Sequence, residues 1–529
     1  MGDFRLRERR DRGLDEGGKG SSSGGPRLGT GFRACDGLMN SRQDTRPNIL
    51  FFMPDQLRSD FLGCYGAGFA RTPHIDALAA RGTLYDRCLS PAPICVPARA
   101  SLLTGTTSLE NGILNNGAWL RPDRRECGLH SWPELLSEAG YRTYAVGKMH
   151  FYPWDASEGF QVRSISEDKR QIGILDDYAQ FLASRGKHKQ HAREFAGYHE
   201  NGGACLSPLK PDEQVDLWCA DRAISILEQH DGSQPFAMMI GFPSPHCPYD
   251  PPPEIADLFD PADMPPPLPE TRESEALRPW LIANMKNPWA DIDYSVFTDD
   301  QKAKVRAHYS ALIHIVDKAV GRVIATLERM GLHKNTIVVF SSDHGDFVGD
   351  YSLVCKNFFM DPSIRVPMIV AGPGVPFEIR YDTVALSDLY PTFLELAGVS
   401  PRENCSFTSL LRPPREEPRT ICGATHRGFM IEKGRKKLAR YVGGVVTLHD
   451  MEADPGEQLN LADDPGWHFT RQELDAFLTE WQVQESIKGH SEKAIVYSAE
   501  SKPELGNEPG ILGPGWRRPY PFSSETTRS

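Results

Sequence analysis

The chain has 529 residues, of which 40% are hydrophobic and 25% charged, as is typical of a globular protein with enough apolar side chains for a sizeable core. Its formal net charge of −12 at pH 7 argues against a general binder of nucleic acids or of anionic membranes, because both need a basic surface. No run of about 18 apolar residues occurs, so no membrane span is predicted.

The first 46 residues are rich in Arg, Gly and Ser and lack apolar periodicity, which predicts a disordered tail. Arg9 and Arg10 are not followed by the apolar stretch of an export signal, and Met39 is a second candidate for the start of the protein. The 11 cysteines are scattered and odd in number. Without a signal peptide, this favours reduced thiols and a cytoplasmic location.

From residue 47 onward, short apolar runs of strand length alternate with amphipathic stretches. The runs predict strands at 48–53, 142–146, 236–241, 336–340 and 366–370. The amphipathic stretches predict helices at 74–81, 97–104, 132–139, 215–230, 300–330 and 387–397. This alternation predicts an α/β fold over residues 47–415, with a mainly parallel sheet flanked by helices on both faces.

Two later segments have a different character. Residues 243–269 are crowded with prolines, which predicts a long extended loop and excludes a helix or a central strand. After about residue 415, short strand-like pieces at 420–423, 437–442 and 445–449 precede a turn at 454–456 and a helix near 471–484. We therefore predict a small α+β C-terminal subdomain at 416–498 and an irregular extension at 499–529.

Polar side chains follow four of the predicted strands. They are Asp55, Gln56, Lys148, His150, His246, Asp343 and His344. One such residue would more often be a helix cap, a turn residue or an ordinary histidine, but parallel strands bring all four places to one edge of the sheet. Two carboxylates and a histidine are suitable ligands for one hard or borderline divalent cation.

Cys95 precedes the predicted helix at 97–104. Pro97 suits a first helical turn, so Cys95 should lie at the helix N-terminus, where backbone N–H groups and the macrodipole favour anions. Arg99, one turn further along, adds a cation on the same side. From these residues alone, a small buried hydrophobic role for Cys95 is as well supported as a functional one.

The segment Cys95-Val96-Pro97-Ala98-Arg99, continued by Thr104-Gly105, resembles the sulfatase signature C-x-P-x-R-x-x-x-x-T-G. The likeness covers most of residues 47–465, including Gly147-Lys148-Met149-His150, Pro245-His246-Cys247-Pro248, Ser342-Asp343-His344-Gly345-Asp346 and the segment from Asp450 to Glu457. The resemblance implies the alkaline-phosphatase-like α/β fold with a small C-terminal subdomain.

In sulfatases, a separate formylglycine-generating enzyme oxidises the signature cysteine to formylglycine, whose hydrated aldehyde is the nucleophile. The resemblance implies that Cys95 is this residue and that one divalent cation, calcium in most of the family, is held by Asp55, Gln56, Cys95, Asp343 and His344. Gln56 replaces an aspartate of many members. It offers a neutral carbonyl or leaves the ion, which moves the preference toward magnesium or manganese.

The resemblance also assigns catalytic roles to basic residues. Arg99 and Lys148 would hold the modified Cys95, and His150 would assist it as a base. Lys356 would bind the sulfate oxygens, and His246 would protonate the leaving oxygen. The alternatives are a solvated lysine at 356, which lacks the glycine that commonly precedes it, and ordinary hydrogen-bonded histidines at the other two positions.

These features predict an enzyme that hydrolyses a small sulfate ester and needs a formylglycine-generating enzyme as its maturation partner. A phosphonate monoester or phosphodiester hydrolase with the same site is the nearest alternative, and a non-catalytic member that only binds anions is the other. Neither a nucleic acid nor a membrane is expected as a partner. The physiological substrate and the oligomeric state, a homo-oligomer included, stay open.

Overall fold

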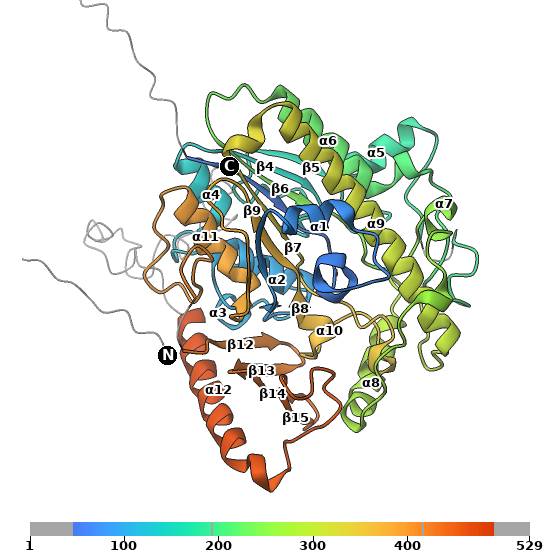
Figure 1. The fold of residues 1–529 in the computed structure, drawn as a ribbon, viewed down its shortest axis with the longest axis vertical. Helices are drawn as coiled ribbons and strands as arrows, with labels where there is room; N and C mark the ends of the chain where they lie inside the picture. Colours follow the sequence, from blue (N-terminus) through green and yellow to red (C-terminus); the bar gives the residue numbers. More distant parts are fainter. Residues whose placement is uncertain (1–45, 192–193, 415–416, 491–529) are drawn as a thin grey trace, which may run out of the picture. The chain divides into compact units, whose positions relative to one another are not determined.

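The computed structural model describes residues 46–191, 194–414 and 417–490, and an eight-stranded sheet lies at the centre of this part (Figure 1). Its strands, in spatial order, are β10 (Glu378–Arg380), β2 (Gly82–Tyr85), β9 (Met368–Ala371), β7 (Thr336–Ser341), β1 (Asn48–Phe52), β6 (Phe236–Gly241), β4 (Arg142–Gly147) and β5 (Val162–Ile165). The five strands from β7 to β5 are parallel, and β9 runs antiparallel to both of its neighbours. The predicted α/β fold with a mainly parallel sheet is confirmed.

Strand β1 shows why the central strands are continuous apolar runs. Leu50 and Phe52 pack into one hydrophobic cluster, while Ile49 and Phe51 pack into another on the opposite face. Helices α1 (Pro73–Ala79), α6 (Val215–Gln229) and α9 (Asp299–Arg329) contribute to the first cluster; α2 (Cys95–Thr104), α4 (Trp132–Glu138) and α11 (Leu389–Leu396) contribute to the second. The prediction of helices on both faces is therefore confirmed.

The predicted strand at 366–370 is wrong as a single strand. It divides at Pro367 into β8 (Arg365–Val366) and the antiparallel strand β9. Strand β8 pairs with β3 (Cys88–Leu89), which also pairs with β11 (Val384–Ala385), in a separate three-stranded sheet. Proline has no N–H to donate, so a single ladder does not continue through this position.

Two helices contain prolines that make them difficult to predict from the sequence. The segment predicted to be extended contains the single-turn helix α7 (Pro253–Ala256), so the exclusion of a helix there was wrong. Proline fits the first turn of a helix, where its missing N–H has no intrahelical partner in any case. Helix α8 (Arg272–Met285) has Pro279 in its interior and buries Leu277 and Leu281 on one side. These contacts hold α8 in place despite the lost backbone hydrogen bond.

The C-terminal sheet is antiparallel and has the strands β12 (Thr420–Thr425), β13 (Gly428–Lys433), β14 (Lys436–Tyr441) and β15 (Val446–Asp450). Helix α12 (His468–Gly489) lies along this sheet, and the two share a small apolar core (Figure 1). The predicted strands and helix of this part are present, and β13 is additional. Residues 1–45 of the predicted tail at 1–46 lie outside the described residues, as do residues 415–416 at the predicted boundary and the extension at 499–529.

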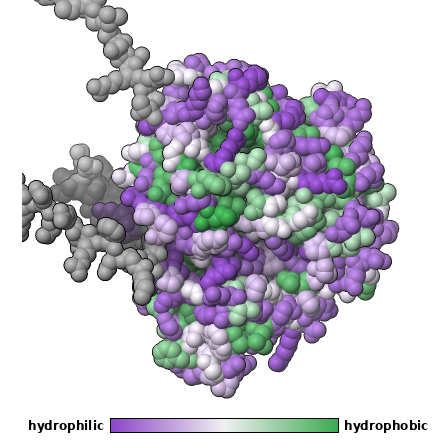
Figure 2. Space-filling view, in the orientation of Figure 1, coloured by the Kyte–Doolittle hydropathy of each residue, from purple (hydrophilic) through white to green (hydrophobic). Residues whose placement is uncertain are grey.

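The visible surface shows hydrophilic and hydrophobic residues interspersed over the described part of the chain (Figure 2). None of the helices in this part combines the length and the apolar character that crossing a membrane requires.

Candidate active site

The site lies where the carboxyl ends of β1, β6, β4 and β7 meet the N-terminus of α2. Parallel pairing places Phe52 beside Ile240 on one side and Phe340 on the other, so the segments that follow these strands start at the same level. Asp55 and Asp343 occupy two of these segments, and Cys95 is the first residue of α2. The predicted position of Cys95 at a helix N-terminus is thus confirmed.

Four potential metal ligands surround one point. Ligand atoms of Asp55, Cys95, Asp343 and His344 all lie within 4.8 Å of one another, and all four residues are buried. His344 Nδ1 lies 2.9 Å from the carbonyl oxygen of Gly345, which fixes the proton on Nδ1. Its Nε2 therefore directs a lone pair at the cluster, 3.2 Å from Cys95 Sγ. This donor set fits one divalent cation.

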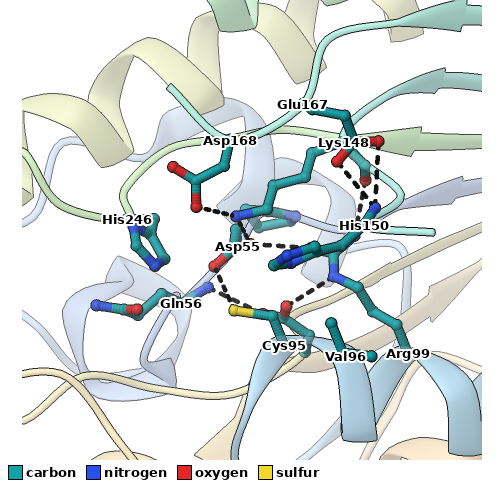
Figure 3. Close-up of polar contacts among 12 residues, drawn as sticks. Asp55, Gln56, Cys95, Val96, Arg99, Lys148, His150, Glu167, Asp168 and His246 are labelled. Carbon is teal, nitrogen blue, oxygen red and sulfur yellow. Dashed lines mark hydrogen bonds and ion pairs between the residues drawn. The ribbon is translucent and has the colours of Figure 1, made fainter. Parts of the chain in front are cut away.

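Gln56 lies next to this cluster, but its side chain is directed elsewhere. The carbonyl oxygen accepts a hydrogen bond from Lys356 Nζ, and the amide nitrogen donates to a carboxylate oxygen of Asp346. Figure 3 shows the side chain pointing away from the sulfur of Cys95. Both polar atoms of the Gln56 side chain are thus used in hydrogen bonds to Lys356 and Asp346.

Two cations hold the carboxylates in place. Arg99 Nε lies 2.9 Å from Asp343 Oδ2, and its NH2 lies 3.2 Å from Asp55 Oδ2. Lys148 Nζ lies 2.6 Å from Asp55 Oδ2 (Figure 3). Burial would raise the pKa of Asp55, but the attraction of Lys148 and Arg99 holds that pKa far below its usual value. The carboxylate is therefore ionised and ready to bind a cation.

Positive charge also acts on the thiol of Cys95. Burial opposes ionisation of the thiol, but the nearby charges of Lys356 and Lys148 hold its pKa well below the usual value. The ring of His150 also favours the charged form of the sulfur. The surroundings of residue 95 therefore stabilise a negatively charged group at this position.

Two glycines allow the backbone to close around Arg99. A Cβ atom on Gly241 would lie 2.1 Å from the carbonyl oxygen of Lys148, and one on Gly147 would lie 2.1 Å from the carbonyl oxygen of Gly241. Because neither residue has a side chain, the ends of β4 and β6 approach closely. The carbonyl of Lys148 then accepts a 2.7 Å hydrogen bond from Arg99 NH1.

His246 has a defined tautomer. Its Nδ1 donates a 2.7 Å hydrogen bond to the carbonyl oxygen of Cys247. Its Nε2 lies 2.8 Å from Lys356 Nζ and 3.2 Å from Arg170 NH2. Both neighbours are donors only, so Nε2 is the acceptor and the atom at which the ring gains or gives a proton. The structure thus brings His246 and Lys356, two residues that the resemblance assigns to the site, into contact.

Asp168 and Arg170 also belong to this site, although no sequence motif indicates them. Asp168 accepts a hydrogen bond from Lys148 Nζ at 3.0 Å, and it pairs with Arg170 through both of its oxygens. Burial would raise the pKa of Asp168, but Arg170 and Lys148 hold it well below the usual value. The preceding strand β5 is only partly buried and has no apolar run, so its end is not marked in the sequence.

A pocket of about 350 Å³ leads to the site from the surface. Residues that line it include His150, Asp168, Arg170, Lys356, Trp280 and Trp289. Its inner end is basic and its outer part carries the two indoles. An anionic head group with a larger organic substituent would fit this arrangement.

A family model described as Sulfatase matches residues 47–399. The chain belongs to the sulfatase family. This sulfatase is 28% identical over 463 residues to an arylsulfatase of Clostridium perfringens, covering 79% of this chain and 90% of that protein. It is equally similar, at 28% over 463 residues, to a choline-sulfatase of Rhizobium meliloti, with coverages of 82% and 85%. These relatives show that it is a sulfuric ester hydrolase.

The solved structures confirm the alkaline-phosphatase-like fold of this sulfatase. A phosphonate monoester hydrolase of Agrobacterium radiobacter superposes with a TM-score of 0.71 at 24% identity, covering 83% of this chain and 96% of that one. At this identity the likeness bears on the fold alone.

Proposed function

We propose that this sulfatase hydrolyses a sulfate monoester with a formylglycine made from Cys95 and one divalent cation. The observation that carries the proposal is the convergence of Asp55, Asp343 and His344 on Cys95, with all four ligand atoms within 4.8 Å. Residue 95 and these three side chains would hold the ion, with calcium, magnesium or manganese as candidates. Gln56 is a fifth candidate ligand only if its amide leaves Lys356.

The cation and the modified residue 95 would supply distinct chemistry. The cation would lower the pKa of a bound hydroxyl, and a hydrated aldehyde at position 95 would supply that hydroxyl as the nucleophile. A second hydroxyl on the same carbon would allow sulfate to be expelled without attack of water on the enzyme ester. We therefore propose a separate formylglycine-generating enzyme as the maturation partner, in the cytoplasm.

The side chains of the protein provide charge stabilisation and proton transfer. Arg99 and Lys148 hold residue 95 and its carboxylate neighbours, while Lys356 and Arg170 face the pocket where the sulfate oxygens would lie. Such preorganised cations stabilise the charge that develops on the oxygens in the transition state. His246, when it is protonated at Nε2, would donate that proton to the leaving oxygen.

His150 acts on residue 95 from the other side of the site. Its ring favours the charged form of the sulfur, and its Nδ1 is buried without a hydrogen-bond partner among the described residues. The backbone N–H of His150 donates to Glu167 at 3.1 Å, which holds the residue in position (Figure 3). We assign His150 the role of the base that accepts a proton from the nucleophile.

The proposal is tested on protein co-produced with a formylglycine-generating enzyme. We expect mass spectrometry of the peptide around residue 95 to show the aldehyde, and 4-nitrophenyl sulfate to be hydrolysed. Metal analysis should give about one divalent ion per chain, and chelation should remove the activity until calcium, magnesium or manganese is restored. Full activity with an unmodified Cys95 and no bound ion would refute the proposal.

Hydrolysis of phosphonate monoesters is the second candidate, because these esters present the same single negative charge to Lys356 and Arg170. The decisive measurement compares kcat/KM for 4-nitrophenyl sulfate and 4-nitrophenyl phenylphosphonate on one preparation. A higher value for the sulfate supports our proposal, and a higher value for the phosphonate supports the second candidate. A protein that binds both esters but hydrolyses neither would be the non-catalytic member.

A further inference from the structure

The outer part of the pocket contains two indoles whose faces are already next to cations. The guanidinium of Arg427 lies over the ring of Trp280, 4.7 Å from its centroid, and that of Arg170 lies over Trp289 at 4.6 Å. Aromatic faces are the usual binding surface for a quaternary ammonium group. Here the nearby guanidinium groups would repel such a group.

The pocket also provides no free anion for a positively charged substrate. Among the described residues that line it, Asp168 is the single carboxylate. Its oxygens are bound by Arg170 and by Lys148, so its charge is already compensated. Together with Lys356, these residues leave an excess of positive charge around the substrate.

Arg427 is an uncompensated cation beside this pocket: it stacks on the lining residue Trp280 but does not itself line the pocket. It lies in the turn between β12 and β13, directly after His426, which lines the pocket and whose ring centroid is 5.4 Å from that of Trp280. Its Nε is buried and has no hydrogen-bond partner in the described part of the chain, where the guanidinium also forms no ion pair. A buried donor of this kind is costly unless a ligand satisfies it.

We infer that the alcohol portion of the substrate is a ring that carries a second negative charge, and that Arg427 binds this charge. The inference rests on the proposed function and deepens it. The ring would lie along Trp280, Trp289 and His426, while the sulfate ester reaches Lys356 and His246. Arg427 is thus a specificity-determining residue supplied by the C-terminal sheet. An alcohol with a quaternary ammonium group is excluded as the preferred leaving group.

The test uses three aryl sulfates that differ in one ring substituent: a carboxylate, a carboxamide or a trimethylammonium group. We expect kcat/KM to be highest for the carboxylate and lowest for the trimethylammonium ester. Arg427→Gln should lower the carboxylate-to-carboxamide ratio about fivefold, the effect of one partly exposed ion pair, mainly through KM. The acidity of each leaving group does not depend on the protein, so it does not affect the comparison of this ratio between the wild type and Arg427→Gln.

Arg440→Gln is the matched control, because Arg440 lies on β14, is half exposed and pairs with Asp475 of α12. It should leave the ratio unchanged. An equal ratio in the wild type and Arg427→Gln, or a preference for the trimethylammonium ester, would overturn the inference.

Calorimetric binding of the three esters to Cys95→Ala protein gives the same comparison without turnover. If the wild type hydrolyses none of the esters while the Cys95→Ala protein binds the carboxylate best, the result would count against the proposed function and support the inference. Equal binding of all three esters would overturn the inference.

Discussion

Two buried networks of charged side chains in this sulfatase use their charges differently. One joins the segment between β2 and β3 to the C-terminal sheet: Arg87 pairs with Asp361 at 2.6 Å and with Glu432 of β13 at 2.5 Å. Lys437 pairs with the same Asp361 at 2.6 Å and with Glu457 at 3.0 Å. Each charged group in this interface network has a partner, and none of its residues lines the active-site pocket.

The active-site network is equally buried, but not all of its polar groups have a partner among the described residues. The Cys95 sulfur is surrounded by groups that favour a negative charge there, and Nδ1 of His150 has no partner among the described side chains. The comparison teaches that buried charge by itself does not indicate function. A network with all its charges paired holds two parts together, whereas one with unsatisfied groups beside a pocket is prepared for a ligand.

The largest effect should come from Cys95→Ala. Removing the nucleophile should lower turnover by roughly 10⁴-fold or more, because the remaining residues can only bind the ester. The thermal unfolding temperature should stay close to that of the wild type, since the thiol joins no ion pair that closes the fold. Turnover of an aryl sulfate and calorimetric unfolding measure the two effects. Retention of the wild-type rate would contradict the assignment of the nucleophile.

His246→Ala tests the proton donor of the active-site network. For alkyl sulfates, whose leaving groups need a proton, we expect kcat to fall about 10²–10⁴-fold. For 4-nitrophenyl sulfate, whose leaving group is stable as an anion, the loss should be much smaller. Rates on a series of esters with leaving groups of increasing pKa check this. Equal losses along the series would reject the role of His246 as an acid.

Arg87→Ala tests whether the interface network stabilises the fold. It leaves Asp361 and Glu432 as buried carboxylates without this partner, so we expect the free energy of unfolding to fall by about 3–5 kcal/mol. Arg81→Ala, which breaks the exposed pair with Glu328, is the matched control and should cost less than about 1 kcal/mol. Denaturant unfolding measures both. A similar small loss in the two variants would show that the interface network does not stabilise the fold.

Asp317 is a buried carboxylate that belongs to neither network. It accepts hydrogen bonds from the backbone of His74 and Ile75, and burial raises its pKa from 3.8 to about 7. The folded protein therefore binds this proton more tightly than the unfolded chain does. The contribution of Asp317 to stability is full below about pH 4 and is lost as the pH rises through 7.

Asp317→Asn keeps an oxygen that accepts the two hydrogen bonds but does not titrate. Compared with the variant, the wild type should lose about 1.4 kcal/mol of unfolding free energy per pH unit between about pH 4 and 7. Urea unfolding across this range, on both proteins, gives the difference. A difference that does not change with pH would mean that Asp317 is ionised in the folded state throughout.

The sequence predicts the central part of the fold and site well, because local features mark it. The strand β1 is a continuous apolar run, and Cys95, Pro97 and Arg99 form a contiguous motif on α2. The assigned roles of these site residues stay predictions until the variants above are measured. The structure adds contacts that make those roles chemically reasonable, such as the pairing of Lys356 with His246.

The outer part of the pocket could not be predicted, since its residues are brought together only by tertiary packing. Trp280 lies on α8, which the proline rules do not predict because Pro279 is inside the helix. Arg427 follows β12 and lies more than a hundred positions further along the chain. Arg170 comes after the half-buried strand β5, whose residues carry no clear period. No local pattern links these three positions.

The close approach at Gly147 and Gly241 limits how this enzyme can diversify. Any side chain at either position would separate the ends of β4 and β6 and move the carbonyl of Lys148 away from Arg99. Mutation there should be selected against, whatever ester the enzyme acts on. The positions around Trp280 and Trp289 carry no such restriction, so new specificities can evolve, or be engineered, in the outer pocket while the reaction chemistry is retained.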